Sequence, residues 1–108
     1  MITVTISETN GRRKWSHRTR TTDALTAIIR TMNKHFPQSH NFIPDDVDNV
    51  PSLFASVAST PDVEVTGHIW KPMWHRGVRW NVKGTPVTVT LHNNGLRIAH
   101  EDKVKGLL

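Results

Sequence analysis

The spacing of apolar residues along this chain changes twice, and each change marks a change of secondary structure. In residues 1–7 the apolar side chains stand at every second position, which is typical of a strand with one buried face. In residues 25–36 they recur at every third or fourth position, as on the buried side of a helix. In residues 87–91 the alternation returns. These changes predict an α+β fold.

Turn-forming residues connect the first two expected strands. Asn10 and Gly11 readily adopt positive φ angles and predict a hairpin turn after the first strand. The second strand is expected over residues 12–21, with its even positions facing water and Trp15 on the other side. The two strands should therefore pair as an antiparallel hairpin.

Two helices are expected next. Thr22 or Thr21 can cap the first helix, and Pro37 ends it. The polar stretch between Pro37 and Pro51 predicts a loop, and Pro51 suits the first position of a short second helix. The expected buried side of the first helix consists of Leu25, Ile28, Ile29, Met32 and Phe36.

The C-terminal half is expected to be β structure. Residues 63–82 are rich in β-branched residues and tryptophan, and residues 83–86 predict a turn. A two-residue loop at Asn94-Gly95 would form a last hairpin. It would pair Leu91 with Ile98 and Val89 with His100. The expected order is β-β-α-α-β-β-β-β, an antiparallel sheet with two helices packed on one face, in a single domain over residues 1–108.

Composition excludes several classes of chemistry. The chain has 108 residues and no cysteine, which removes disulfides, cysteine-type zinc sites, iron–sulfur clusters and thiol nucleophiles. No apolar run approaches the roughly 20 residues of a membrane helix, and the start lacks the basic region of a signal peptide. We therefore expect a cytoplasmic protein with no membrane partner. No phosphate-binding glycine loop or nucleophile motif is present, so no cofactor and no catalytic residue is assigned.

Charge is strongly segregated along the chain. The formal net charge is +5, yet residues 37–66 contain five acids and neither lysine nor arginine. The rest of the chain therefore carries ten excess positive charges. The first basic run is Arg12, Arg13, Lys14, Arg18 and Arg20; the second is Lys71, Arg76, Arg79 and Lys83. Such segregation indicates either ordinary solvated surface, with the acids neutralising the basic strands, or a positive face for a polyanion.

Residues 68–83 interleave three tryptophans with four basic residues, as single-stranded nucleic-acid surfaces do. A continuous strand would bury the tryptophans together with Val78 and Val82. A hairpin turning at Arg76-Gly77 would reverse the alternation across the turn. It would direct Ile69, Met73, Val78, Trp80 and Val82 toward the core, and Trp70, Trp74, Arg79 and Lys83 to the opposite face. Gly77, together with Pro72, favours the hairpin.

The first hypothesis is a nucleic-acid-binding accessory protein that engages DNA or RNA largely independently of sequence. Cations would contact phosphates, and exposed tryptophans would stack on bases. Its predicted interface is Arg12, Arg13, Lys14, Arg18, Arg20, Trp70, Lys71, Trp74, Arg76, Arg79 and Lys83.

A second hypothesis is a small inhibitor or adaptor that binds another protein, such as a host nucleic-acid enzyme. Its acids would imitate phosphates, or its Trp/Arg patch would form the central contact. The acids are Asp45, Asp46, Asp48, Asp62 and Glu64. The same charge segregation allows a homodimer.

The third hypothesis is a metal-free ribonuclease. Its acid and base would come from His75, His92 and His100, beside Arg79 and Arg97. We also considered a metal site. His35 and His40, with Asp45, Asp46 and Asp48, offer nitrogen and oxygen ligands, but no metal-binding spacing is present, so no metal is assigned.

Overall fold

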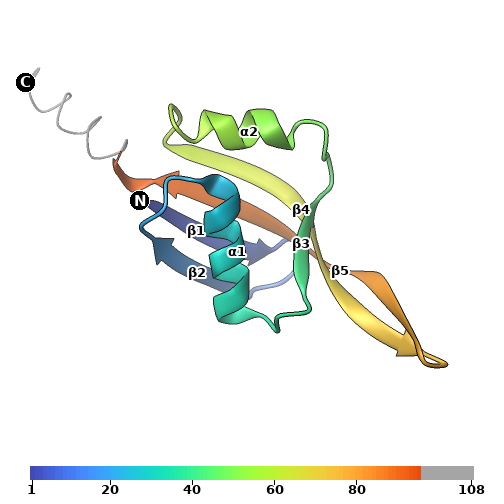
Figure 1. Cartoon of the computed structure of the whole chain (residues 1–108). Coiled ribbons are helices and arrows are strands. Elements are labelled where there is room, and N and C mark those ends of the chain that lie inside the picture. The colour runs from blue at the N-terminus through green and yellow to red at the C-terminus, as the bar shows by residue number, and fades with distance from the viewer. Residues whose placement is uncertain (96–108) are drawn as a thin grey trace, which may run out of the picture.

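The computed structural model describes residues 1–95, which form five strands and two helices (Figure 1). These elements are β1 (Ile2–Glu8), β2 (Lys14–Thr19), α1 (Ala24–His35), β3 (Asn41–Pro44), α2 (Val50–Ser56), β4 (Asp62–His75) and β5 (Val78–Asn93). The α+β class and the antiparallel sheet are confirmed. The predicted order is corrected to β-β-α-β-α-β-β, because a strand lies between the helices and two long strands follow α2. No helix in this part of the chain is long and apolar enough to cross a membrane.

The strands form one sheet in the order β2-β1-β5-β4-β3, and every neighbouring pair is antiparallel. Strand β5 is central: Leu91 pairs with Val4 on one side and with Val63 on the other. Around Leu91, both hydrogen-bonding edges of β5 are therefore occupied, one by β1 and the other by β4. This corrects the expected pairing of β5 with a following strand, whose residues Ile98 and His100 lie outside the described residues.

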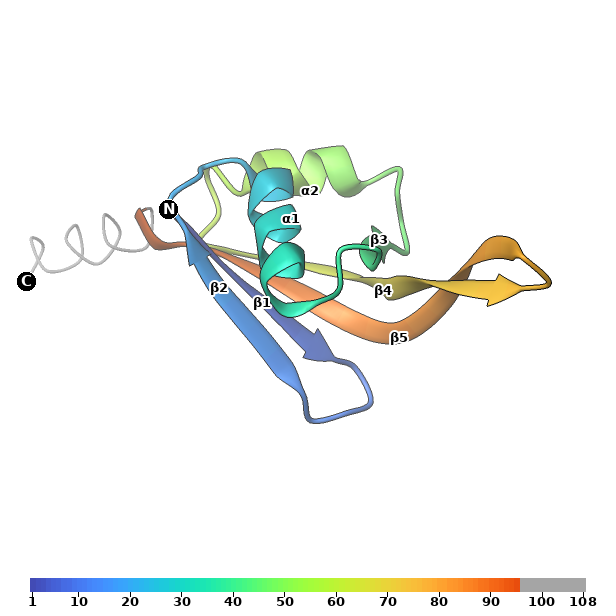
Figure 2. The same cartoon turned by 60° about the horizontal axis from the view of Figure 1, so that its bottom comes forward.

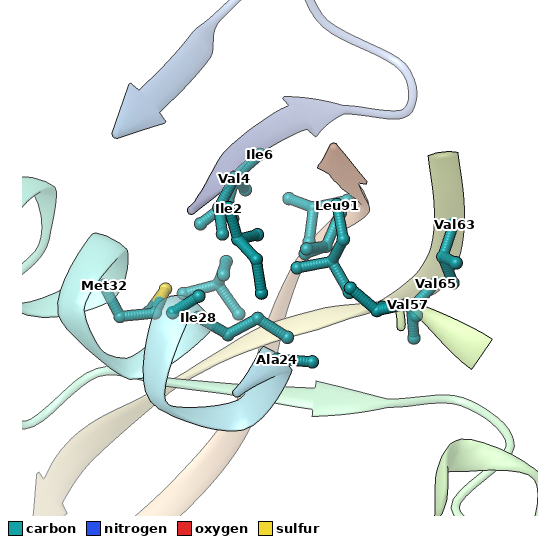
Figure 3. Packing of buried hydrophobic residues seen from close by; sticks show 14 residues of the cluster. Ile2, Val4, Ile6, Ala24, Ile28, Met32, Val57, Val63, Val65 and Leu91 are labelled. Atoms are coloured by element: carbon teal, nitrogen blue, oxygen red, sulfur yellow. The ribbon is translucent and has the colours of Figure 1, made fainter. Parts of the chain in front are cut away.

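The core lies on one face of the sheet. Figure 2 shows both helices on the same side of it. Figure 3 shows apolar side chains of α1, and Val57 directly after α2, meeting those of the strands. Alternate positions of β1, β4 and β5 supply the sheet side of this core, as the twofold spacing predicted. The buried apolar residues are Ile2, Val4, Ile6, Ala24, Ala27, Ile28, Met32, Val57, Val63, Val65, Ile69, Val87, Val89 and Leu91.

Helix α1 begins one residue later than predicted, and the side of it that faces the sheet differs from the predicted side. Its cap is Asp23, whose carboxylate accepts hydrogen bonds from the Thr26 hydroxyl at 2.7 Å and from the Thr26 N–H at 2.9 Å. These two hydrogen bonds, the hydroxyl one first, lower the pKa of Asp23. The buried stripe includes small residues such as Ala24 and Ala27, which let the helix approach the sheet closely. Leu25 and Ile29, predicted to be core, are instead exposed.

The predicted loop after α1 contains the edge strand β3. It pairs with β4, with Pro44 opposite Gly67. A Cβ atom at Gly67 would lie 2.4 Å from the carbonyl oxygen of Ile43, so only glycine allows this close approach of the two backbones.

The predicted turn at residues 83–86 is instead a bulge inside the continuous strand β5. His68 pairs with Pro86, whereas Trp70 pairs with Lys83, so one extra residue of β5 faces Ile69. Gly84 lies in this bulge, and a Cβ atom there would be 2.4 Å from the Ile69 carbonyl oxygen. Because a bulge bends and twists a strand, it marks the place where β4 and β5 leave the body of the sheet together.

Candidate nucleic-acid interface

Beyond the bulge, β4 and β5 continue as a two-stranded projection, which we call the arm and define as residues 70–83. Figures 1 and 2 show it extending away from the helices. Arg76 (φ 51°) and Gly77 (φ 76°) form its tip, and two consecutive positive φ angles suit a tight hairpin turn. The hairpin predicted for this segment is therefore present, with its turn at the predicted residues. The expected positive φ at Asn10-Gly11 is not found.

The register of the arm assigns its side chains to two faces. Trp74 lies opposite Arg79, and Trp70 lies opposite Lys83. Paired residues share a face, so these four side chains form what we call the basic face, as the hairpin model predicted. The other side, the apolar face, carries Lys71, Met73, His75, Val78, Trp80 and Val82.

Both faces of the arm are open to solvent. Trp74 is 69% exposed and Trp80 is 59% exposed, whereas Trp70 is half-buried. Of the five residues predicted to face the core, Ile69 is buried. The prediction is wrong for the other four, Met73, Val78, Trp80 and Val82, which are exposed. The reason is that both helices end their coverage of the sheet before the arm begins (Figure 2).

The first basic run is spread along β2 and its flanking loops. Lys14 lies on the sheet face opposite the helices, which we call the helix-free face, in one row with Ser7, Thr88 and Thr66. The basic face of the arm and the helix-free face lie on the same side of β4. The reason is that the β4 residues of both faces have even numbers, and side chains alternate along a strand. Arg18 belongs to the row of Thr3, His92 and Asp62, at the end of the sheet remote from the arm. Arg20 follows β2 at that same end, so neither arginine joins the arm.

Arg12 and Arg13 lie in the β1–β2 connection, at the end nearer to the arm. The Arg13 guanidinium donates to the Glu8 carboxylate, with Nε 2.9 Å from Oε1, and lies 5.4 Å from the Trp15 ring centroid. The hydrogen bond raises the pKa of Arg13 and lowers the pKa of Glu8. Arg13 is therefore paired with Glu8, and both Arg12 and Arg13 are exposed at the surface.

One hollow brings the two basic runs together. Arg13 and Lys71 both line a cavity of about 220 Å³ between the β1–β2 connection and the base of the arm. Three residues with aromatic rings, Trp15, Phe36 and His40, also line this cavity. Trp15 packs against Phe36 with ring centroids 4.7 Å apart. The convergence of the two runs is thus partial: it includes Arg13 and Lys71 at this hollow, and Lys14 on the continuous face.

The acids of residues 37–66 come from two places. Asp45, Asp46 and Asp48 lie in the connection from β3 to α2, whereas Asp62 and Glu64 lie on β4. The Nδ1 atom of His68 lies 2.8 Å from Asp45 Oδ1, and Asp62 contacts Nδ1 of His92. Asp46 accepts a hydrogen bond from the Asn49 side chain at 2.6 Å. At least three of the five carboxylates therefore have partners within the fold.

The geometry does not assemble the proposed ribonuclease histidines. His75 lies beside the arm tip, opposite Val78, and His92 lies near the other end of β5. Val78 and His92 are fourteen positions apart along β5, roughly 45 Å at the usual rise per residue. These two histidines therefore cannot act on one phosphate. His100 and Arg97 lie outside the described residues.

The side chains considered for a metal site make other contacts. His35 Nε2 donates to the Ser16 carbonyl oxygen at 2.9 Å, and Asp45 contacts His68. Within residues 1–95 no group of three or more histidines and carboxylates is arranged to hold a metal ion.

A cationic cluster between β2 and α1 was not predicted. His17 lies on the helix-covered side of β2, near Arg30, Lys34 and His35 of α1. Burial, followed by the charges of Lys34, His35 and Arg30, lowers the pKa of His17 below its ordinary 6.5. In the sequence, the i, i+4 spacing of Arg30 and Lys34 indicates only that they share one face of a helix. It does not indicate which strand lies opposite that face.

This shift gives a pH prediction. Unfolded His17 takes up a proton at a higher pH than folded His17, so its contribution to stability is complete above 6.5 and is lost as the pH falls through 6.5 to the lower folded pKa. We expect wild-type protein to lose more unfolding free energy than His17→Gln between about pH 8 and about pH 5, either side of the ordinary histidine pKa. Urea unfolding at both pH values measures this; equal losses would contradict it.

Comparisons of the chain with protein-family models, with curated proteins and with solved structures find no match. The functional argument therefore depends on the geometry described above.

Proposed function

We propose that this protein binds nucleic acid, and that the basic face of the arm makes the main contact. The supporting observation is the pairing of Trp74 with Arg79 and of Trp70 with Lys83 on one face of the arm. Trp70 is half-buried, and the other three side chains are exposed. An aromatic ring beside a cation offers a stacking surface for a base and a partner for the adjoining phosphate. Arg76 at the tip and Lys71 at the base add two further cations to the arm.

The charge of the arm supports the same partner. No acidic residue occurs between Thr66 and His100 in the sequence, so the arm offers a polyanion no carboxylate to repel it. Lys14 extends the positive surface onto the helix-free face. We assign the interface to these residues and leave out Arg18 and Arg20, which lie at the remote end of β2.

A single strand fits the arm better than a duplex does. Stacking on Trp74 needs a base whose faces are free, and bases in a duplex are already stacked on each other. We infer that binding is largely independent of sequence and occurs in the cytoplasm. The inhibitor alternative receives less support, because Asp45, Asp46 and Asp62 are already engaged within the fold.

Tryptophan fluorescence tests the proposal. A short single-stranded oligonucleotide should quench the emission at low salt, and added salt should reverse the quenching. If the four arm cations each contact one phosphate, the slope of log affinity against log salt should be about −3. Absence of both quenching and a mobility shift would refute the proposal, and tighter binding of an equally long duplex would refute the preference for a single strand.

Substitution of Trp74 locates the contact on the arm. Loss of one stacked base costs about 1–3 kcal/mol, so Trp74→Ala should weaken oligonucleotide binding by about fivefold to a hundredfold. Trp80→Ala is the matched control, since it removes an equally large ring from the opposite face of the same arm. Equal losses from the two substitutions would show that the basic face is not the contact surface.

A further inference from the structure

The apolar side chains on the second face of the arm have no role in polyanion binding. Met73, Val78, Trp80 and Val82 expose a continuous apolar surface on this face. A two-stranded hairpin standing alone in water is only marginally stable, and a contiguous exposed apolar patch marks a site of association. We therefore expect the apolar face of the arm to pack against another apolar surface.

An apolar groove of matching character lies on the helix-covered side of the same molecule. It measures about 170 Å³ and runs between α1, β3 and α2. Its walls include Leu25, Ile29, Phe42, Val50 and Phe54. Leu25 is 52% exposed and Ile29 is 49% exposed, which is unusual for two large apolar residues on one helix stripe. Only the base of the arm, at Trp70, meets one of these elements, where it pairs with Asn41 of β3. The rest of the arm extends away from α1 and α2, so the arm of the same chain does not cover the groove (Figure 1).

The charges of the two surfaces are complementary. Pro44 and Val50 line the groove, and the connection between them carries Asp45, Asp46 and Asp48. Asp45 and Asp46 also contact His68 and Asn49, so the complementarity depends most on Asp48. The apolar face of the arm carries Lys71 and His75 and belongs to a segment without acids. Charge complementarity of this kind fixes which surface meets which.

We propose that the groove receives the apolar face of the arm from a second copy of this chain. In a two-fold dimer each arm enters the groove of the other copy, which gives two equivalent contacts and a closed assembly. Both basic faces then point outward. The dimer therefore goes beyond the proposed function and presents two nucleic-acid contacts in place of one.

Two double variants test the dimer. The arm variant Met73→Thr with Trp80→Thr removes the apolar contact, and the groove variant Leu25→Glu with Ile29→Glu puts charge on the groove wall. All four positions are exposed, so the fold should tolerate the changes. Sedimentation over the micromolar range should show a dimer for wild type and a dissociation constant raised at least tenfold for each variant.

Mixing the two variants distinguishes this arrangement from others. The groove variant has an intact arm and the arm variant has an intact groove, so an equimolar mixture should form a heterodimer with one intact contact. A wild-type protein that stays monomeric throughout would overturn the proposal. So would association that grows without limit, or a mixture that recovers no dimer. Each monomeric variant keeps its basic face and should still bind a short oligonucleotide, which separates this test from that of the proposed function.

Discussion

Reversing the charges of Arg79 and Lys83 to glutamate is expected to weaken binding of a short single-stranded oligonucleotide at least a hundredfold. Each side chain lies directly opposite an arm tryptophan, on a surface open to solvent. A hydrogen bond to a charged group contributes about 1.5–3 kcal/mol, and each reversal also adds repulsion. Two lost phosphate contacts therefore remove about 3–6 kcal/mol, which corresponds to a hundredfold or more. Fluorescence anisotropy of a labelled oligonucleotide measures the change.

The matched control for this prediction is reversal of cations outside the arm. Arg30→Glu with Lys34→Glu makes the same change of net charge on α1. This control should reduce affinity only by its effect on the overall field, which salt screens over about 10 Å at 0.1 M. If the two double variants lose affinity equally, net charge and not the arm governs binding.

Truncation of Leu91 is expected to have the largest effect on stability. Leu91 is fully buried near the C-terminal end of β5, the central strand of the sheet, and pairs with strands on both sides. Replacement of a buried leucine by alanine costs about 2–5 kcal/mol, from lost apolar contact and from the cavity left behind. A small domain has about 5–15 kcal/mol in total, so Leu91→Ala removes a large part of it. Urea unfolding gives the difference in free energy.

Thr90→Ala provides the comparison for Leu91→Ala. Thr90 is the neighbouring residue of the same strand and faces the helix-free side, where its side chain is only half-buried. Its truncation should cost well under half as much as that of Leu91. Similar losses at both positions would mean that the core does not lie on the side of β5 assigned to it.

Spacing alone predicted the elements with one buried face. The alternation at Ile2, Val4 and Ile6 gave β1, and its return at Val87 and Val89 gave the core part of β5. The pairing of strands required contacts distant in sequence. Because β5 is central and β1 is its neighbour, the first and last described strands lie side by side, and local turn signals carry no information about this.

The rotation of α1 shows a second limit of the sequence. The largest apolar residues predicted a buried stripe through Leu25 and Ile29, but the helix buries Ala24 and Ala27 together with Ile28. Small residues allow the helix to lie close to the sheet, while the larger ones line the groove. Hydrophobicity identifies an apolar face, but the choice between neighbouring stripes depends on what packs against them.

Turn residues were informative only in part. Gly77 correctly marked the arm tip, although its partner in the turn is an arginine, a residue that rarely has positive φ. Gly84 and Pro86 suggested a turn but lie in a bulged strand. Strand β1 ends at Glu8, opposite Val87, so Pro86 lies past the end of the neighbouring strand, where a missing N–H is tolerated.

The part of the candidate interface that was predicted correctly is the part that depends only on the register of the arm hairpin. The hairpin placed Trp70, Trp74, Arg79 and Lys83 on one face, and the structure has them there. The position of the arm outside the helix layer could not be predicted, because it depends on the length of the sheet that the helices cover. For the same reason, the sequence could not separate Arg18 and Arg20 from the remaining cations.

The most direct test of the nucleic-acid assignment removes the outer part of the arm, with the Trp74–Arg79 pair and Arg76, and retains the sheet. Replacing residues 72–81 by Asn-Gly joins the paired residues Lys71 and Val82 through a two-residue turn. Circular dichroism and urea unfolding should show a folded domain of nearly unchanged stability. Oligonucleotide affinity at low salt, measured by anisotropy, should fall at least a hundredfold relative to wild type. A folded, arm-shortened protein that binds as tightly as wild type would contradict the assignment.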